Sequence, residues 1–147
     1  MLETTIKKFD VLTTNELYAI LRLRSEVFVV EQDCVYQDLD DKDQKALHVI
    51  GWFDHTIVAY TRIFDVKLYF DEASIGRVVV NQNYRSKGFG KDIINASIDA
   101  IKSHFKQTQI KISAQTYLIK FYNELGFKEL GKPYLEDGIP HTVMIKN

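Results

Sequence analysis

Cysteine and proline are scarce in this sequence of 147 residues. The single cysteine, Cys34, excludes an internal disulfide and fits a reducing compartment. Both prolines lie near the end of the chain, and no Pro- or Gly-rich linker divides it. Because 46% of the residues are hydrophobic, the length allows a substantial core. We therefore expect one globular domain over residues 1–147.

A strong charge of one sign and long hydrophobic runs are also missing. The formal net charge is −1, so no general positive field attracts nucleic acid or an anionic membrane. No stretch approaches the roughly 20 apolar residues of a membrane helix. The amino-terminal sequence MLETTIKKFD lacks the apolar core of a secretion signal. We expect a cytoplasmic protein that has no nucleic-acid or membrane partner.

The most informative segment runs from residue 75 to residue 105 and predicts a strand, a basic glycine loop and a helix. Ile75–Val80 is mostly β-branched, as in a buried strand. The loop has the sequence Arg85-Ser86-Lys87-Gly88-Phe89-Gly90-Lys91, and one helix face then carries Ile94, Ile98, Ile101 and Phe105. Glycines let the backbone turn sharply, and free N–H groups at a helix start bind anions. The segment predicts a phosphate or pyrophosphate site.

Two common phosphate motifs do not fit this loop. A Walker A loop needs Ser or Thr after its Gly-Lys pair, but Asp92 follows Gly90 and Lys91. A dinucleotide fingerprint needs a third glycine where Ile93 stands. The anion bound here is therefore held by a different kind of loop.

The rest of the chain predicts further strands and helices. We expect strands at 5–11, 46–53, 56–66, 109–115, 127–130 and 141–146, and helices starting near residues 13–15 and 116. The segment 133–140 is expected to be a turn-rich loop. The acidic stretch 29–45 lacks the Gly and Glu positions of an EF-hand, so we expect a solvated loop rather than a calcium site.

Two motifs carry a resemblance to a known family. Arg-x-x-Gly-x-Gly between a strand and a helix resembles the acetyl-CoA loop of the GCN5-related N-acetyltransferase (GNAT) family. The helix end Phe121–Phe127 resembles the family's Tyr-x-x-x-Gly-Phe pattern. Nearly the whole chain is similar to the ElaA-like subgroup, through the segments 23–34, 38–40, 75–78, 114–115 and 136–141, together with Met144. It departs from that pattern at Val35, where Pro is expected, and at Lys42, where Gly is commoner.

The resemblance implies a fold and an activity. The fold is α/β (α+β), with a central mixed, mostly antiparallel sheet flanked by helices. The activity is transfer of the acetyl group of acetyl-CoA to a primary amine of a small molecule or a peptide end, by direct attack in a ternary complex and without a metal. An exposed sheet edge in this family also allows a homodimer. Two alternatives are an acetyl-CoA sensor without turnover and an acyltransferase like the acyl-homoserine lactone synthases.

The resemblance also implies cofactor-binding positions. The pyrophosphate would rest on the N–H groups of Ser86–Lys91, with charge from Arg85, Lys87 and Lys91. The pantetheine arm would lie along Val78, Val79 and Val80, in a slot made where this strand and its neighbour splay apart. Tyr122 matches the acid that protonates the leaving thiolate. The cofactor-binding set is thus Val78, Val79, Val80, Arg85, Ser86, Lys87, Gly88, Phe89, Gly90 and Lys91.

The base and the substrate ligands are less determined by the sequence. An imidazole with the ordinary pKa of about 6.5 accepts a proton near neutrality, which makes His141 our candidate base. Glu31 or Glu136, acting through a water, is the alternative. Arg24 lies on the apolar face of its helix and forms either a structural ion pair or, together with Arg77, a site for a substrate carboxylate or phosphonate. Gln115 and Glu31 are expected to line the same pocket.

Overall fold

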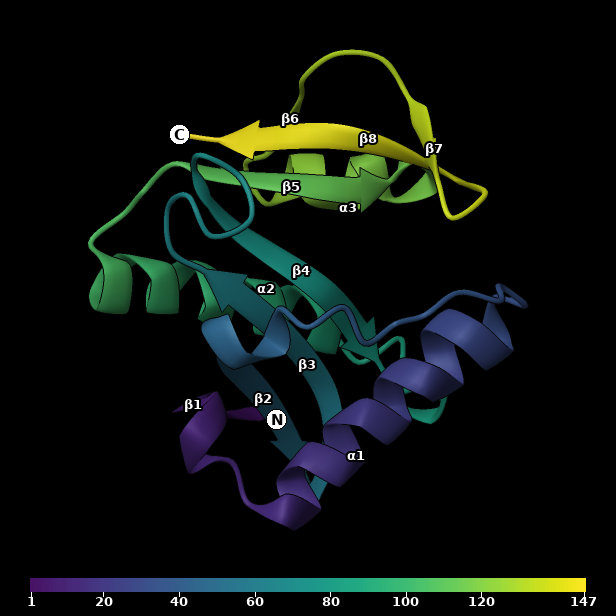
Figure 1. Cartoon of the computed structure of the whole chain (residues 1–147), viewed down its shortest axis with the longest axis vertical. Coiled ribbons are helices and arrows are strands. Elements are labelled where there is room, and N and C mark those ends of the chain that lie inside the picture. Colours follow the sequence, from purple (N-terminus) through teal and green to yellow (C-terminus); the bar gives the residue numbers. More distant parts are fainter.

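The computed structural model describes the whole chain, Met1–Asn147, and contains one eight-stranded sheet with helices on both faces (Figure 1). The helices are α1 (Thr14–Arg24), α2 (Phe89–Ala100) and α3 (Ile119–Glu124). The strands are β1 (Glu3–Lys8), β2 (Leu47–Phe53), β3 (Thr56–Phe64), β4 (Ala73–Val80), β5 (Ile110–Gln115), β6 (Lys128–Glu129), β7 (Tyr134–Glu136) and β8 (Ile139–Lys146). None of the helices is both long and apolar enough to cross a lipid bilayer.

The sheet is mixed and mostly antiparallel, which confirms the predicted fold class. Its strand order is β1-β2-β3-β4-β5-β8-β6, with β7 paired to β8. Only the β4–β5 pair is parallel. That pair lies in the middle of the order, and the site described below forms there.

Helices α1 and α2 cover opposite faces of the sheet because successive strand residues point to opposite sides. On β2, Val49 packs in the cluster that contains the buried isoleucines of α2, whereas Ile50 packs with Ile20 and Leu23 of α1. Both helices continue into π-helical turns, Ser25–Glu31 after α1 and Ile101–Phe105 after α2. Thr13 caps α1 through reciprocal hydrogen bonds with Glu16, in agreement with the helix start expected near residues 13–15.

Strands β4 and β5 separate soon after they pair. Their register contains only Ala73 opposite Ile110 and Ser74 opposite Lys111. Farther along β4, Arg77 and Val78 oppose a single residue of β3, because Tyr60 pairs with Val79 and Arg62 with Gly76. This is a β-bulge, which bends the strand that carries the extra residue. The predicted splay of these two strands is confirmed.

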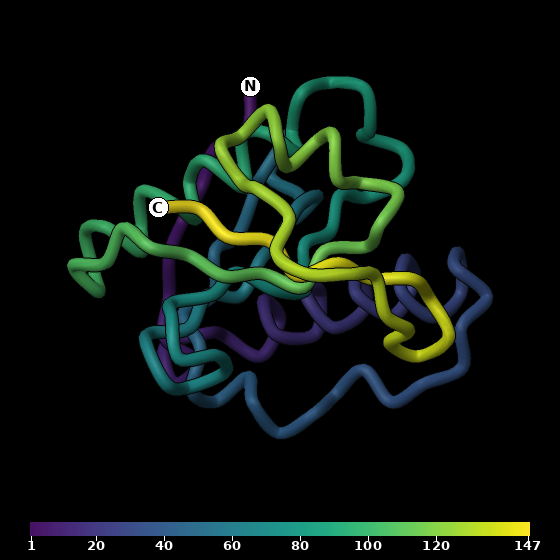
Figure 2. The backbone as a smooth tube through the Cα atoms, turned by 90° about the horizontal axis from the view of Figure 1, so that it is seen from above, coloured from purple at the N-terminus to yellow at the C-terminus, as the bar shows by residue number.

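Two element predictions were wrong in detail. The first strand ends at Lys8, and Phe9–Val11 forms a 3₁₀ turn. The segment 133–140 is not a loop, since β7 and β8 form a hairpin through Asp137 and Gly138. Their φ angles are 51° and 78°, and an Asp-Gly pair with two positive φ angles is the preferred turn of a tight hairpin. In Figure 2 this hairpin reaches toward the segment that follows the first helix.

Candidate active site

A cavity of about 860 Å³ opens where β4 and β5 separate. Its walls come from β4, β5, the glycine loop, α3, the end of the first helix and the β7–β8 hairpin. Every predicted site residue lines it except Arg24 and Lys87. The strand-loop-helix segment and the two carboxy-terminal hairpin strands are therefore brought to one place, although they are far apart in the sequence.

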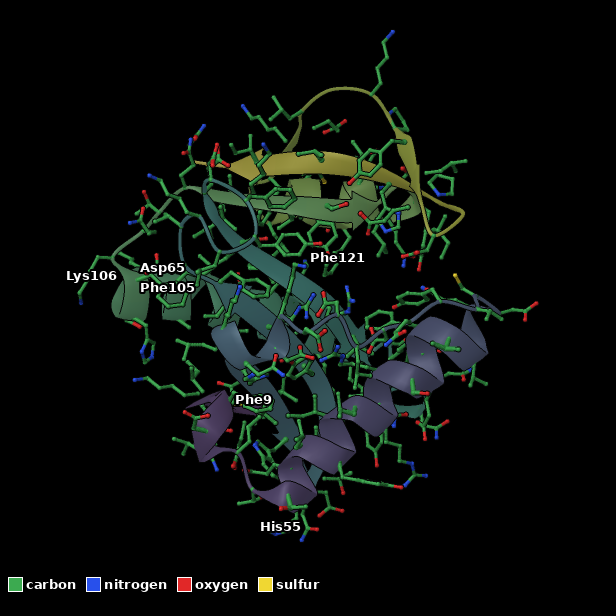
Figure 3. The ribbon with its side chains drawn as sticks, viewed as in Figure 1. Phe9, His55, Asp65, Phe105, Lys106 and Phe121 are labelled. Carbon is green, nitrogen blue, oxygen red and sulfur yellow. The ribbon has the colours of Figure 1, made fainter.

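The glycine loop has the geometry of an anion cradle. Ser86 and Gly88 have φ angles of 66° and 80°, and α2 begins directly after Gly88. Left-handed residues before a helix start aim several N–H groups at one point, where the helix dipole also favours negative charge. A Cβ added at Gly90 would lie 3.4 Å from the ring of Phe121, which is labelled in Figure 3. The loop fits a diphosphate group.

Arg85 serves this loop structurally, because its charge is already paired. Its guanidinium donates two hydrogen bonds to Glu31, at 2.5 and 2.9 Å, and two to the carbonyl of Val80, at 3.2 and 3.1 Å. Hydrogen bonding to the Glu31 carboxylate raises the pKa of Arg85. Lys91 has only a 3.8 Å contact with Glu124. The contribution of Glu31 is thus to fix Arg85 at the rim of the cavity.

Tyr122 reaches the cavity from α3 and is 5% exposed. Its hydroxyl makes no hydrogen bond within the protein. Burial, with a smaller effect of nearby Tyr117, raises the pKa of Tyr122. The phenol therefore stays protonated near neutral pH and has a proton available for a group in the cavity.

His141 lies on β8 and also lines the cavity, and its partner in the antiparallel pair with β5 is Gln115. The residue is 8% exposed, and its Nδ1 is 2.7 Å from the carbonyl oxygen of Ile139. Because a carbonyl only accepts, Nδ1 carries the proton and Nε2 of the neutral ring has a free lone pair. Nε2 lies 3.5 Å from Oε2 of Glu136. The ring is in the tautomer that a general base needs.

Glu136 is held in place by β5. Ser113 donates a hydrogen bond of 3.2 Å to Oε1 of Glu136, and the same hydroxyl contacts the phenol of Tyr134. Sequence reasoning missed Ser113 and Tyr134. The alternation of β5 was visible in the sequence, but the pairing of β7 that brings Tyr134 across was not.

Arg24 is not a substrate ligand, which corrects the prediction. It is 0% exposed, does not line the cavity, and bonds Asp38 and Asp43, both at 2.8 Å. Of the two alternatives for Arg24, the structural ion pair is the one observed. Asp38 and Asp43 are buried, so these two acids are not solvated as we expected, although about half of the acidic stretch is exposed. An arginine on the apolar face of a helix needs buried anions, and these two aspartates supply them.

Two further arginines complete this arrangement, which we call the arginine–aspartate network (Arg24, Arg62, Arg77, Asp38, Asp40 and Asp43). Arg62 contacts Asp40 at 2.6 Å and Asp43 at 2.9 Å. Arg77 lines the cavity but contacts Asp38 at 2.7 Å. The sequence signal for Arg62 was its place on a strand that is otherwise apolar. The matching numbers of arginines and aspartates make the network neutral.

A family model described as an acetyltransferase (GNAT) domain matches residues 11–147. The chain belongs to the GNAT family. Protein ElaA of Escherichia coli K12 is 36% identical over 137 residues, which cover 92% of this chain and 90% of ElaA. A UPF0039 protein of Schizosaccharomyces pombe is 37% identical, covering 97% of this chain and 95% of its own length.

Solved structures of GNAT proteins agree over the whole chain. The crystal structure of E. coli ElaA superimposes with a TM-score of 0.92 at 34% identity, with 100% of both chains covered. An acyl-CoA N-acyltransferase from Pseudomonas aeruginosa gives a TM-score of 0.93 at 38% identity, also with 100% of both chains covered. These relatives confirm the ElaA-like subgroup, and acyl-CoA is the co-substrate class of the family.

Proposed function

We propose that this protein transfers the acetyl group of acetyl-CoA to a primary amine of a small molecule by direct attack. The supporting observation is that one cavity has a glycine-loop anion cradle at one end and two buried proton-transfer groups, Tyr122 and His141, in its walls. The cradle suits a diphosphate, and the two groups suit the proton movements of acyl transfer.

In the proposed reaction, a nitrogen–carbon bond forms between the amine and the thioester carbonyl, and the carbon–sulfur bond breaks. Nε2 of His141 takes the proton that the attacking nitrogen loses. The hydroxyl of Tyr122 gives a proton to the leaving sulfur, which departs as a thiol. No residue of the chain becomes acylated.

His141 is a better base than the two carboxylates that we considered. Glu31 is occupied by Arg85 through two hydrogen bonds. Glu136 accepts a hydrogen bond from Ser113 and lies beside Nε2 of His141. Its carboxylate can therefore stabilise His141 electrostatically once the ring is protonated. The separation of these roles supports His141 as the group that takes the proton.

The test is thiol release from acetyl-CoA by the purified protein in the presence of a panel of small amines, with mass spectrometry of the products. We expect amine-dependent thiol release and an acetylated amine. Saturable binding of acetyl-CoA without thiol release from any amine would reject the transferase and favour a sensor. Acylation of the protein itself would reject direct attack.

A further inference from the structure

The part of the cavity next to the β7–β8 hairpin, where the acceptor amine would bind, carries an excess of negative charge. Arg77 is the arginine that faces this end, and it is paired with Asp38 within the neutral network. Two carboxylates of the hairpin, Glu136 and Asp137, also line the cavity. Neither has an ion pair with a lysine or arginine. An anionic acceptor would meet these carboxylates without a free arginine to balance them.

Two polar groups of the cavity wall can still bind a ligand among these carboxylates. Nε2 of His141 lies 3.5 Å from Oε2 of Glu136, and both atoms are hydrogen-bond acceptors whenever the ring is neutral. A donor between them removes the repulsion, and an ammonium group provides several N–H donors. The hydroxyl of Tyr122, 5% exposed, opens into the same cavity without a partner.

We propose that the acceptor is a dication such as a diamine, with one ammonium held between Glu136 and His141 and the second held by Asp137. This inference rests on the proposed function and names its substrate class. Glu136 binds the incoming ammonium, which loses its first proton to solvent and becomes the neutral amine. His141 takes the second proton as the nitrogen–carbon bond forms, and Glu136 then lies next to the imidazolium and stabilises it. Asp137 is exposed at the hairpin turn and favours a second positive charge beyond the reacting nitrogen.

A matched series of acceptors tests the charge preference directly. 1,4-Diaminobutane, 1-aminobutane and 4-aminobutanoate share a four-carbon chain and differ at the far end by a positive, a neutral and a negative group. We expect kcat/KM for thiol release to fall in that order, by about tenfold between the diamine and the neutral amine. Equal rates, or a preference for 4-aminobutanoate, would overturn the proposal.

Two variants locate the preference in the hairpin. Asp137→Asn keeps a residue that tolerates positive φ, and it should bring the diamine down to the level of 1-aminobutane. Glu136→Gln can still accept a bond from Ser113, and it should raise KM for all amines about tenfold. As a control, Glu3→Gln removes a carboxylate from the exposed start of β1. It should change neither the preference for the diamine nor KM for amines. If neither hairpin variant changes the kinetics, the proposal fails.

Calorimetry separates this inference from the proposed function. With free CoA present no acetyl transfer can occur, so the binding of 1,4-diaminobutane is measured alone. We expect saturable binding that Asp137→Asn weakens. Such binding without any turnover would reject the transferase and keep the cation site. Turnover of other amines, without diamine binding, would reject the cation site and keep the transferase.

Discussion

The side chain of Tyr122 is largely buried, its phenol is protonated, and its hydroxyl has no protein partner, so removing the hydroxyl tests one proton transfer in isolation. Tyr122→Phe should lower kcat about 100-fold, the smaller end of general acid contributions. The affinity for acetyl-CoA should stay within about twofold, because the ring still fills the same space. Thiol release and calorimetry measure the two quantities. Tyr18→Phe, exposed on α1, is the control, and full activity of Tyr122→Phe would remove the phenol from the reaction.

His141 is the residue that should take the proton from the attacking amine. His141→Ala should lower kcat/KM about 100-fold, because the group that accepts this proton is lost. Thiol release measures the change. His104→Ala, exposed at the end of the second helix, is the control. Full activity of His141→Ala would mean that a carboxylate is the base.

The sequence predicted most of the cavity residues but not how their charges are paired. The glycine loop and Tyr122 were found because both lie in short motifs with fixed spacing. Arg24 was placed wrongly because its partners, Asp38 and Asp43, are 14 and 19 residues away in a segment with no regular pattern. Ion pairs between distant segments leave no periodic signal, so only the folded chain reveals them.

At the level of elements, the glycine loop can be tested by adding single methyl groups. Gly88→Ala places a Cβ on a residue with a φ of 80°, although no atom lies within 4 Å of it. The left-handed conformation then costs roughly 1–2 kcal/mol, and we expect the loop to relax and weaken acetyl-CoA binding about tenfold. Calorimetry measures the affinity.

The control for this experiment is Gly131→Ala. Its φ is 85° and its surroundings are equally open, but it lies in the connection between β6 and β7. It should lose similar stability and retain the affinity for acetyl-CoA. Equal loss of affinity in both variants would show that general strain, rather than the loop itself, caused the effect.

Helices and strands were predicted correctly where the local sequence signal was strong. The helix start near residues 13–15 and the two strands that became β2 and β3 were predicted correctly, because capping and strand patterning are local properties. The hairpin around Asp137 and Gly138 was expected to be only a loop. Tyr134–Glu136 is a strand of three residues, too short for alternation to show, and its pairing with β8 decides its conformation.

At the scale of the whole molecule, the arginine–aspartate network ties the segment after the first helix to β3 and β4. Asp43→Asn removes one charge that two buried arginines share. Breaking a buried ion pair from one side typically costs 3–5 kcal/mol, so we expect a loss of about that size in the free energy of unfolding. Denaturant titration measures it. Asp41→Asn, exposed in the same segment, should change it little, and similar losses in both variants would contradict the network's role.

The same network predicts an acid-sensitive stability. Burial works to raise the pKa of Asp43, but the hydrogen bond and charge of Arg24, together with the charge of Arg62, outweigh it and hold the pKa below its usual value. Since the folded pKa is lower than the unfolded value of about 3.9, the stabilisation is complete above that pH. It is lost as pH falls through the folded pKa. The deficit of Asp43→Asn should therefore shrink below about pH 4, whereas a constant deficit would point to packing instead.

The early parting of β4 and β5 has a consequence for the resting protein. The backbone of β4 beyond Ser74 loses its β5 neighbour, so the sheet has a seam down its middle with only two paired positions closing it. A ligand bound between the separated parts of β4 and β5 contacts both strands and so links the two halves of the sheet. Amide hydrogens bordering the seam should exchange fastest when the protein is empty and slow markedly once acetyl-CoA is added, while those of β2 and β3 hardly change.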